Sequence, residues 1–333
     1  MRKASVTLVA FALFMSMFAG FAAAADTTVF QLGHLDPGKE NNAYQILCVT
    51  FKKHIREVSG GKFDVEIFSD AQLGGERAMM EGMQIGTVDM AIITNNYYSS
   101  FVPGFMLFDL PYLFSGYEEA RRALDDKEIT APMEQEAWDQ FGVKFLGWGD
   151  SGFRYVVNNV RPIVNVEDFK GIKIRLPESP LYVETFQALG ANPTTMAFSE
   201  TFTAVQQGTV DGLEITASAI NTAGYYEVCK YLSLTRHFNS PITLNMSAAL
   251  WQGLTEEEQG WFMEAMRRTT KEQREKVIRI EQSLLDEMGK TIAINETGDI
   301  AQFREASKPA YDYVRKQIGA DRVDNFLKKL GFL

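Results

Sequence analysis

The sequence contains few of the residues that build disulfide scaffolds, metal sites and nucleophilic active sites. It has only two cysteines, Cys48 and Cys229, and three histidines in 333 residues. Both cysteines lie in apolar segments far apart in the sequence, so we expect buried free thiols and not a disulfide. His34, His54 and His237 are scattered without the spacing of a metal site, and no Gly-x-Ser-x-Gly motif is present. The sequence therefore predicts a protein without a catalytic centre, a metal or a cofactor.

Positive charge is also scarce. Lysine and arginine number 33 against 43 aspartates and glutamates, which gives a formal net charge of −10. Such a balance argues against nucleic acid or an anionic membrane surface as the main partner. It does not exclude a small anion, because a few arginines in a cleft set the local field there. The chain is long for one core, so we expect two lobes.

Beyond the first residues, no apolar run is long enough to cross a bilayer. In Met1–Ala25, Arg2 and Lys3 precede the apolar run Val6–Phe21, and small alanines lead to Asp26. This order is typical of a signal peptide, and the short run favours cleavage over a retained membrane anchor. We therefore expect a mature protein that begins at Asp26 and is exported to the periplasm.

Strand and helix patterns alternate along the chain. The first five expected elements are a strand at Thr28–Leu32, a helix at Asn42–Val58, a strand at Phe63–Phe68, a helix ending at Ile85 and a strand at Met90–Thr94. This order predicts a mainly parallel sheet with helices on both faces. Further on, we expect one strand at Lys144–Trp148, a second after Gly152, and helical structure from Ala217 through Leu232.

A long helix is expected near the C-terminus. Thr255 and Glu258 form a capping box, and the helical pattern then runs to Met288 with no proline. At about 1.5 Å per residue this helix reaches about 45–50 Å, enough to brace two lobes. The alternative is a coiled-coil dimer helix, but the apolar spacing is not a sustained heptad.

Two arginines are the main candidates for binding chemistry. Arg175 ends the short strand pattern Ile172–Arg175, and ligands bind at the carboxyl ends of strands in open α/β sheets. Arg154 follows Gly152 at the base of another strand. A guanidinium presents paired donors that fit the two oxygens of a carboxylate. The alternative for Arg175 is a structural ion pair with a local acid such as Glu178.

Three phrases carry a resemblance to a known family. DFKGIKIRLP (168–177), ALGANPTTMAFSETFTAVQQGTVDG (188–212) and SDAQLGGERAMMEGMQIGTVDMAI (69–92) resemble the substrate-binding proteins of TRAP transporters, the DctP-type family. The resemblance covers nearly all of the mature chain. It implies an α/β, two-lobed periplasmic binding protein fold with mixed, mainly parallel sheets and a long lobe-spanning helix. It also implies a receptor that closes on a small organic acid and delivers it to integral-membrane TRAP transporter subunits.

The lobes should be discontinuous, because the chain crosses the hinge near 148–152, near 237–239 and along the long helix. We expect lobe I to comprise residues 26–150 plus about 239–275. Lobe II would comprise residues 151–238 plus about 276–333, with the ligand cleft between the lobes.

The resemblance also implies a set of ligand-binding residues, with Arg175 as the main anchor. Besides Arg175 and Arg154, the positions of the family pattern indicate Thr94, Asn95, Phe198 and Glu214. Three more candidates come from their places in the expected fold: Trp148 and Asn239 at strand ends near the lobe crossover, and His34 in the loop after the first strand. In one place the chain departs from the family: Ile215 stands where the family often has an asparagine that touches the ligand. This departure argues against sialic acid or a simple C4-dicarboxylate, and favours a more apolar wall or a Glu214 that accepts ligand hydroxyls.

Residues Gly33–Lys39 spell most of a P-loop between a strand and a helix. Glu40, however, replaces the Ser or Thr that would hold Mg²⁺, so we do not expect a nucleotide site. The same loop lies at a strand end, and we expect His34 or Asp36 to reach the organic acid.

Two other functions stay open at this stage: an exported enzyme that acts on an organic acid, and a ligand-sensing subunit. The ligand itself is also open, since a sugar acid, a keto acid, a dicarboxylate and an aromatic acid all fit two arginines.

Overall fold

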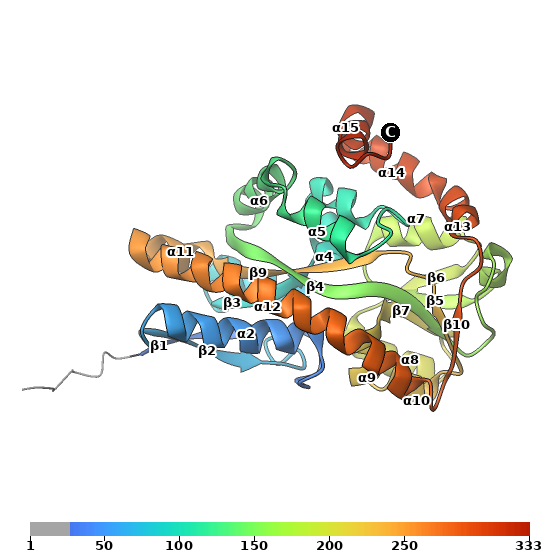
Figure 1. Cartoon of the computed structure of the whole chain (residues 1–333), viewed down its shortest axis with the longest axis horizontal. Helices are drawn as coiled ribbons and strands as arrows, with labels where there is room; N and C mark the ends of the chain where they lie inside the picture. The colour runs from blue at the N-terminus through green and yellow to red at the C-terminus, as the bar shows by residue number, and fades with distance from the viewer. Residues whose placement is uncertain (1–26) are drawn as a thin grey trace, which may run out of the picture.

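The computed structural model describes residues 27–333 (Figure 1). The predicted signal peptide, Met1–Ala25, lies outside the described residues. Within the described part, none of the helices combines the length and the apolar character that a membrane span requires.

The strands form one mixed sheet with the order β2-β1-β3-β9-β4-β7-β5-β6, and β8 and β10 extend it beside β4. The strands are β1 (Thr28–Gly33), β2 (Phe63–Phe68), β3 (Met90–Thr94), β4 (Val143–Asn158), β5 (Lys173–Leu176), β6 (Asn192–Thr195), β7 (Gly212–Thr216), β8 (Tyr231–Leu234), β9 (Asn239–Ser247) and β10 (Ala293–Glu296). β1 is parallel to β2 and β3, and β5 is parallel to β6 and β7. β4 and β9 run antiparallel to their neighbours, so the sheet is mixed as predicted.

The helices cover both faces of this sheet. In the N-terminal half they are α2 (Ala43–Val58), α3 (Glu76–Ile85), α4 (Asn95–Ser99), the 3₁₀ helix η1 (Pro103–Asp109), α5 (Tyr117–Asp125) and α6 (Lys127–Phe141). In the C-terminal half they are the 3₁₀ helix η2 (Val166–Phe169), α7 (Pro180–Ala188), α8 (Phe198–Gln206), α9 (Ala217–Thr222), α10 (Tyr225–Val228), α11 (Ala248–Gly253), α12 (Glu256–Met288), α13 (Ile300–Ala306), α14 (Lys308–Ile318) and α15 (Ala320–Lys329). Figure 1 shows α12 running diagonally across the front of the molecule, from the end near α2 to the end near α10.

The fold has two lobes that share β4. We call the half that carries β1, β2 and β3 lobe I, and the half that carries β5, β6 and β7 lobe II. The first half of β4 pairs with β9, and the second half pairs with β7 and β8. We expected two strands here, but β4 is one strand whose register shifts between Asp150 and Phe153. Gly152, at φ +105°, lies in this shift and lets the strand bend from one lobe into the other. The residue boundaries of the lobes stay a prediction.

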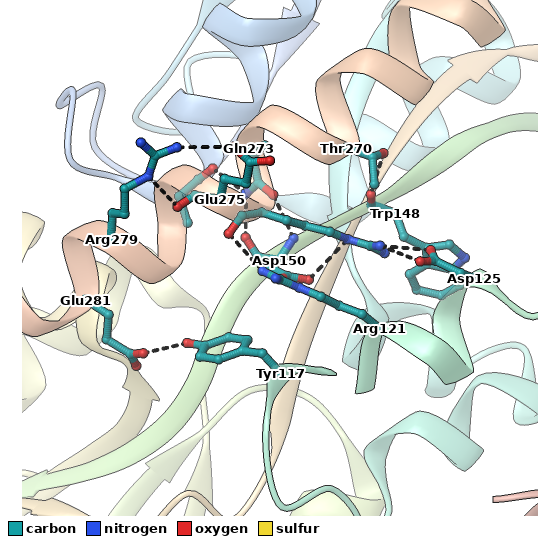
Figure 2. Close-up of polar contacts among 12 residues, drawn as sticks. Tyr117, Arg121, Asp125, Trp148, Asp150, Thr270, Gln273, Glu275, Arg279 and Glu281 are labelled. Carbon is teal, nitrogen blue, oxygen red and sulfur yellow. Dashed lines mark hydrogen bonds and ion pairs between the residues drawn. The ribbon is translucent and has the colours of Figure 1, made fainter. Parts of the chain in front are cut away.

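The helix α12 is fastened to β4 at the bend (Figure 2). Gln273 pairs with the backbone of Asp150: the Asp150 amide donates to Gln273 Oε1 (3.0 Å), and Gln273 Nε2 donates to the Asp150 carbonyl (2.6 Å). The buried Asp150 carboxylate accepts a hydrogen bond from Arg121 Nε of α5 (2.7 Å), and Arg274 Nε lies 3.7 Å away. A buried carboxylate between two guanidinium groups is compensated, so this arrangement holds the helix in one position on the strand.

A second contact between α12 and its neighbours lies further along the helix, at Glu281. The Glu281 carboxylate accepts hydrogen bonds from the hydroxyls of Tyr117 and Tyr155, each at 2.7 Å. Tyr117 belongs to α5 and Tyr155 to the second half of β4, so one carboxylate joins both sides of the bend. A Cβ on Gly152 would lie 3.1 Å from the Tyr117 hydroxyl, which is a second reason for glycine at this point.

Three details of the sequence prediction were wrong or incomplete. The segment after Val228 does not continue as a helix, because Tyr231–Leu234 pairs with β4 and β10 as strand β8. β6 was not predicted because Pro193 breaks a strand pattern, and β6 is at the edge of the sheet, where proline is tolerated. The helix α11 was also missed. Cys48 and Cys229 are both buried and are free thiols.

The capping box of α12 gives a test of the fold. The Thr255 hydroxyl accepts from the Glu258 amide (3.3 Å), and Glu258 Oε2 accepts from the Thr255 amide (2.8 Å). Thr255→Ala removes the first bond and should lower the free energy of unfolding by about 1 kcal/mol. Thr255→Ser keeps the capping oxygen and should unfold close to the wild type in urea. Equal loss in both variants would show that the cap does not stabilise this helix.

Candidate functional site

A cavity of about 370 Å³ lies between the two lobes. We call it the outer cavity; a smaller space of about 50 Å³, the inner cavity, shares part of its wall and continues toward the sheet. Six residues line both cavities: Leu35, Glu76 and Asn96 in lobe I, and Arg175, Pro177 and Phe198 in lobe II. Spaces of this size hold small organic molecules.

Arg175 lies at the carboxyl end of β5 and is 4% exposed. Its Nε and Nη2 both donate to the carbonyl of Met196, at 3.1 and 2.7 Å. Among residues 27–333, no carboxylate lies within ion-pair distance of this guanidinium. Burial lowers the pKa of Arg175 to about 10, although Glu214 acts in the opposite direction. The group is still charged at neutral pH, so the cavity contains a desolvated cation that a carboxylate would neutralise.

Arg154, in contrast, already has a partner. Its Nη2 donates to Glu214 Oε1 (2.8 Å), and its Nε forms an ion pair with Glu214 Oε2. The other contact of Glu214 is His237, whose Nε2 lies 3.0 Å from Oε2. Burial acts to raise the pKa of Glu214, but Arg154 holds it below its usual value. Burial lowers the pKa of His237, so its imidazole is neutral at neutral pH. Arg154 faces the inner cavity, with the Tyr182 ring 5.5 Å from its Cζ.

The lobe I wall of the inner cavity is acidic. Asp36 and Glu76 both line it, and Arg154 is the cation that acts on both carboxyls. Burial raises the pKa of Asp36 to about 6 and that of Glu76 to about 7. Glu76 Oε1 accepts the backbone amide of Thr94, which fixes its orientation at the end of β3. These two groups can accept hydrogen bonds from hydroxyls, and in their protonated forms they can donate.

Of the two polar residues expected to face the ligand after β3, Thr94 lines the cavity and Asn95 does not; Asn96 takes the place of Asn95. Thr94 lines the inner cavity and caps α4 through its hydroxyl, which accepts from the Tyr97 amide (3.3 Å). Asn95 does not reach the cavity: it is 1% exposed, and its Nδ2 donates to the carbonyl of Phe105 (3.1 Å). Asn96 lines both cavities instead. A helix starts at this point, so consecutive side chains point in different directions.

Apolar side chains form the rest of the wall. The Phe198 ring lies 6.0 Å from Arg175 Cζ and covers the guanidinium. Ile215 lines the inner cavity, where the departure from the family pattern led us to expect a more apolar side. Tyr225 lines the outer cavity and packs on Phe198 at 6.3 Å between ring centroids.

Besides Asn95, four predicted residues do not line either cavity. Glu214 is fully buried beneath Arg154, so it holds that arginine and has no surface for a ligand hydroxyl. Trp148 packs among Phe105, Phe108 and Phe145, on the side of β4 that faces α5 and α12.

The other two are buried in lobe I and at the crossover. His34 is fully buried and its Nε2 lies 2.9 Å from Gln45 Oε1, whereas Asp36 of the same loop reaches the cavity. Asn239 starts β9 and pairs with Phe153 across the sheet. Strand alternation decides such placements, and the sequence did not settle which face each residue takes.

The sequence interpretation missed several wall residues: Glu76, Asn96, Tyr44, Tyr97, Ser151, Thr216 and Tyr225. Glu76 could have been found, because it is the first helical residue after Gly74–Gly75 and an acid is favoured there. The tyrosines carry no such signal. Among residues 27–333, no three His, Cys, Asp or Glu side chains gather as a metal site would require.

Residues 33–317 match the family described as "Bacterial extracellular solute-binding protein, family 7". The 2,3-diketo-L-gulonate-binding periplasmic protein YiaO of Escherichia coli K12 is 30% identical over 291 residues, 86% of each chain. A TRAP periplasmic solute-binding protein from Polaromonas sp. JS666, bound to D-erythronate, is 33% identical with a TM-score of 0.85, covering 90% of this chain and 98% of that one. A TRAP protein from Sulfurospirillum deleyianum with bound succinate is 26% identical with a TM-score of 0.83, covering 90% and 97%.

The raised pKa of Glu76 predicts how stability depends on pH. Its carboxyl holds a proton to about pH 7 in the folded state against 4.5 in the unfolded state. The folded state therefore binds the proton more tightly, and stability is lost as the pH rises through this interval. We expect the free energy of unfolding of the ligand-free protein to fall between about pH 5 and pH 8, and to fall less in Glu76→Gln.

The free energy of unfolding of the Glu76→Gln variant should still fall with rising pH, but less steeply than that of the wild type. Burial also raises the pKa of Asp36 to about 6 and that of Asp109 to about 7. Urea unfolding at several pH values measures the difference between the two proteins. Identical slopes would contradict a buried, protonated Glu76.

Proposed function

Since this chain belongs to family 7 of the bacterial extracellular solute-binding proteins, we propose that it binds a hydroxylated monocarboxylate between its two lobes. The family consists of solute receptors and not of enzymes. Its TRAP members bind small organic acids and work with integral-membrane transporter subunits. The chain is accordingly a receptor that delivers an organic acid to a TRAP-type transporter.

The observation that carries the proposal is the buried charge of Arg175. A desolvated guanidinium whose protein partner is one backbone carbonyl has donors left for an anion. A ligand carboxylate on Arg175 would restore the charge balance, and the Phe198 ring would exclude water from the pair. Arg154 assists from the inner cavity, where its charge is shared with Glu214.

The opposite wall favours hydroxyls over a second carboxylate. Asp36 and Glu76 lie on the lobe I side, and above about pH 6 a second carboxylate of the ligand would meet Asp36 as a like charge. Hydroxyl groups would donate to these acids instead. This distinction sets the chain nearer to the relatives named for 2,3-diketo-L-gulonate and D-erythronate than to the relative with succinate. Ile215 fits the same ligand, because it offers an apolar surface to the carbon chain.

The TRAP solute-binding proteins are periplasmic, and we propose that this chain reaches the periplasm after removal of Met1–Ala25. Expression of the full chain in a Gram-negative host should yield a periplasmic protein whose N-terminal residue is Asp26. Intact mass of the purified protein measures this directly. A mass that retains the first 25 residues would contradict a cleaved signal peptide and favour an anchor.

Arg175→Ala is the sharpest test of the binding proposal. We expect it to weaken the binding of D-erythronate by about 30-fold or more, the cost of removing one member of a buried charge pair. Arg175→Lys keeps the charge but loses the paired donors, so it should fall between the wild type and the alanine variant. Isothermal titration calorimetry on the mature chain measures the affinities.

Two controls make the result specific. Arg236→Ala removes an arginine whose partner is Glu296 on the surface of lobe II, and it should bind as the wild type does. In the wild type, D-erythronate should bind more tightly than succinate, and neutral erythritol should not bind. Unchanged affinity in Arg175→Ala, or erythritol binding as tight as that of the acid, would contradict the proposal.

A further inference from the structure

Asn42 lies between the loop after β1 and the helix α2, at the junction of the two lobes. It is fully buried. Its Oδ1 accepts the backbone amides of Tyr44 (2.9 Å) and Gln45 (3.3 Å), which caps α2. Because the oxygen is used by two N–H donors, the orientation of the side-chain amide is determined. The NH₂ group must therefore point away from the helix.

The two hydrogens of this NH₂ group reach acceptors in different lobes. Nδ2 lies 2.9 Å from Asp36 Oδ2, in the lobe I wall of the inner cavity. It also lies 3.0 Å from Thr222 Oγ1, at the end of α9 in lobe II. The Thr222 hydroxyl donates its own hydrogen to the Ser218 carbonyl (2.7 Å), so its oxygen is free to accept from Asn42. Both N–H groups of the Asn42 amide and the hydroxyl of Thr222 therefore have acceptors.

A second bond runs beside the first. Asn41 Nδ2 donates to Asn221 Oδ1 at 2.9 Å, again from the start of α2 to α9. Asn42, Asp36 and Thr222 are each at most 2% exposed, so the bond through Asn42 is shielded from water. A buried amide hydrogen that lost its acceptor without gaining water would destabilise the arrangement.

We propose that Asn42 is a positioning residue that couples occupation of the cavity to closure of the lobes, by binding the ligand-facing carboxyl of Asp36 and the lobe II residue Thr222 through one amide. This inference rests on the proposed function, since Asp36 is taken to face the ligand. When the lobes separate, the bond to Thr222 breaks while the bond to Asp36 and the helix cap remain. Asn42 thus orients Asp36 in both states and adds a lobe-to-lobe bond in the closed state alone.

Two variants separate this role from the stability of α2. Asn42→Ser keeps a good capping oxygen but is too short to reach both Asp36 and Thr222. Thr222→Val removes the acceptor from the other side and leaves Asn42 in place. Thr185→Val is the matched control: the Thr185 hydroxyl donates to the Leu181 carbonyl at 2.8 Å in the same i to i−4 pattern, within lobe II.

The distance between the lobes is the readout that a merely structural role would not change. Spin labels on Glu81→Cys in α3 and Glu200→Cys in α8 lie on exposed positions of the two lobes. The native cysteines are buried and should not react with the label. Pulsed electron paramagnetic resonance then gives the distance distribution with and without D-erythronate.

We expect both Asn42→Ser and Thr222→Val to lose part of the short-distance population, whereas Thr185→Val keeps the wild-type distribution. Both variants should weaken D-erythronate binding about threefold to tenfold, the effect of one hydrogen bond, mainly through faster dissociation. The double variant should lose little more than either single variant, since both break the same bond.

Distributions equal to the wild type in both variants would overturn the inference, as would a wild-type distribution that lacks a short-distance population with and without the acid. If D-erythronate fails to bind the wild type, the proposed ligand class fails on its own. The ligand-free distributions of the variants still decide the role of Asn42 in that case.

Discussion

The buried Glu214 pairs with one of the two arginines of the cleft, Arg154. The other arginine, Arg175, has no carboxylate partner in the part of the chain that the structure describes. Glu214 neutralises Arg154 through two hydrogen bonds, and its Oε2 also contacts Nε2 of His237. Arg175 is left with a backbone carbonyl. Burying a charge without a partner is costly, so a structure that does so has a strong preference for an anion at that point. The position of the proposed carboxylate site follows from this imbalance, and the proposed preference for hydroxyls follows from Asp36 and Glu76 on the opposite wall.

The fold positions these charged side chains at the cavity. β4 bends at Gly152 and delivers Arg154 to the cavity, while the neighbouring strand β7 carries Glu214, opposite Val156 in the sheet. α12 contacts β4 on both sides of the bend through Gln273 and Glu281, so the helix holds the bend at two points. The two walls of the cavity then differ in their polar groups. Lobe II supplies the cations and lobe I supplies acids, so a bound acid with hydroxyls would complete hydrogen bonds on both sides and favour the closed form.

Much of the fold could be predicted because local chemistry and tertiary structure agree. β2 and β3 were predicted to the residue, and the capping box at Thr255 located the start of α12. The misses have physical causes. Pro193 interrupts the strand pattern of the edge strand β6, which a prediction based on central strands therefore misses.

Within the site, Arg175 could be inferred from its place at a strand end and from the resemblance. Asn95 could not be told from Asn96, nor Trp148 from a wall residue, because one position turns a side chain to another direction along a helix and to the opposite face along a strand. The pairing of Arg154 with Glu214 joins residues 60 positions apart in the sequence and required the structure.

In the proposed complex a ligand carboxylate pairs with the Arg175 guanidinium, and ligand hydroxyls bond to the acids of the lobe I wall. A crystal structure of the mature protein grown with D-erythronate tests this arrangement most directly. We expect both carboxylate oxygens within hydrogen-bond distance of the Arg175 guanidinium, ligand hydroxyls on Asp36 or Glu76, and the Arg154–Glu214 pair intact. A ligand that turns its carboxylate toward lobe I, or that displaces Glu214 from Arg154, would contradict it.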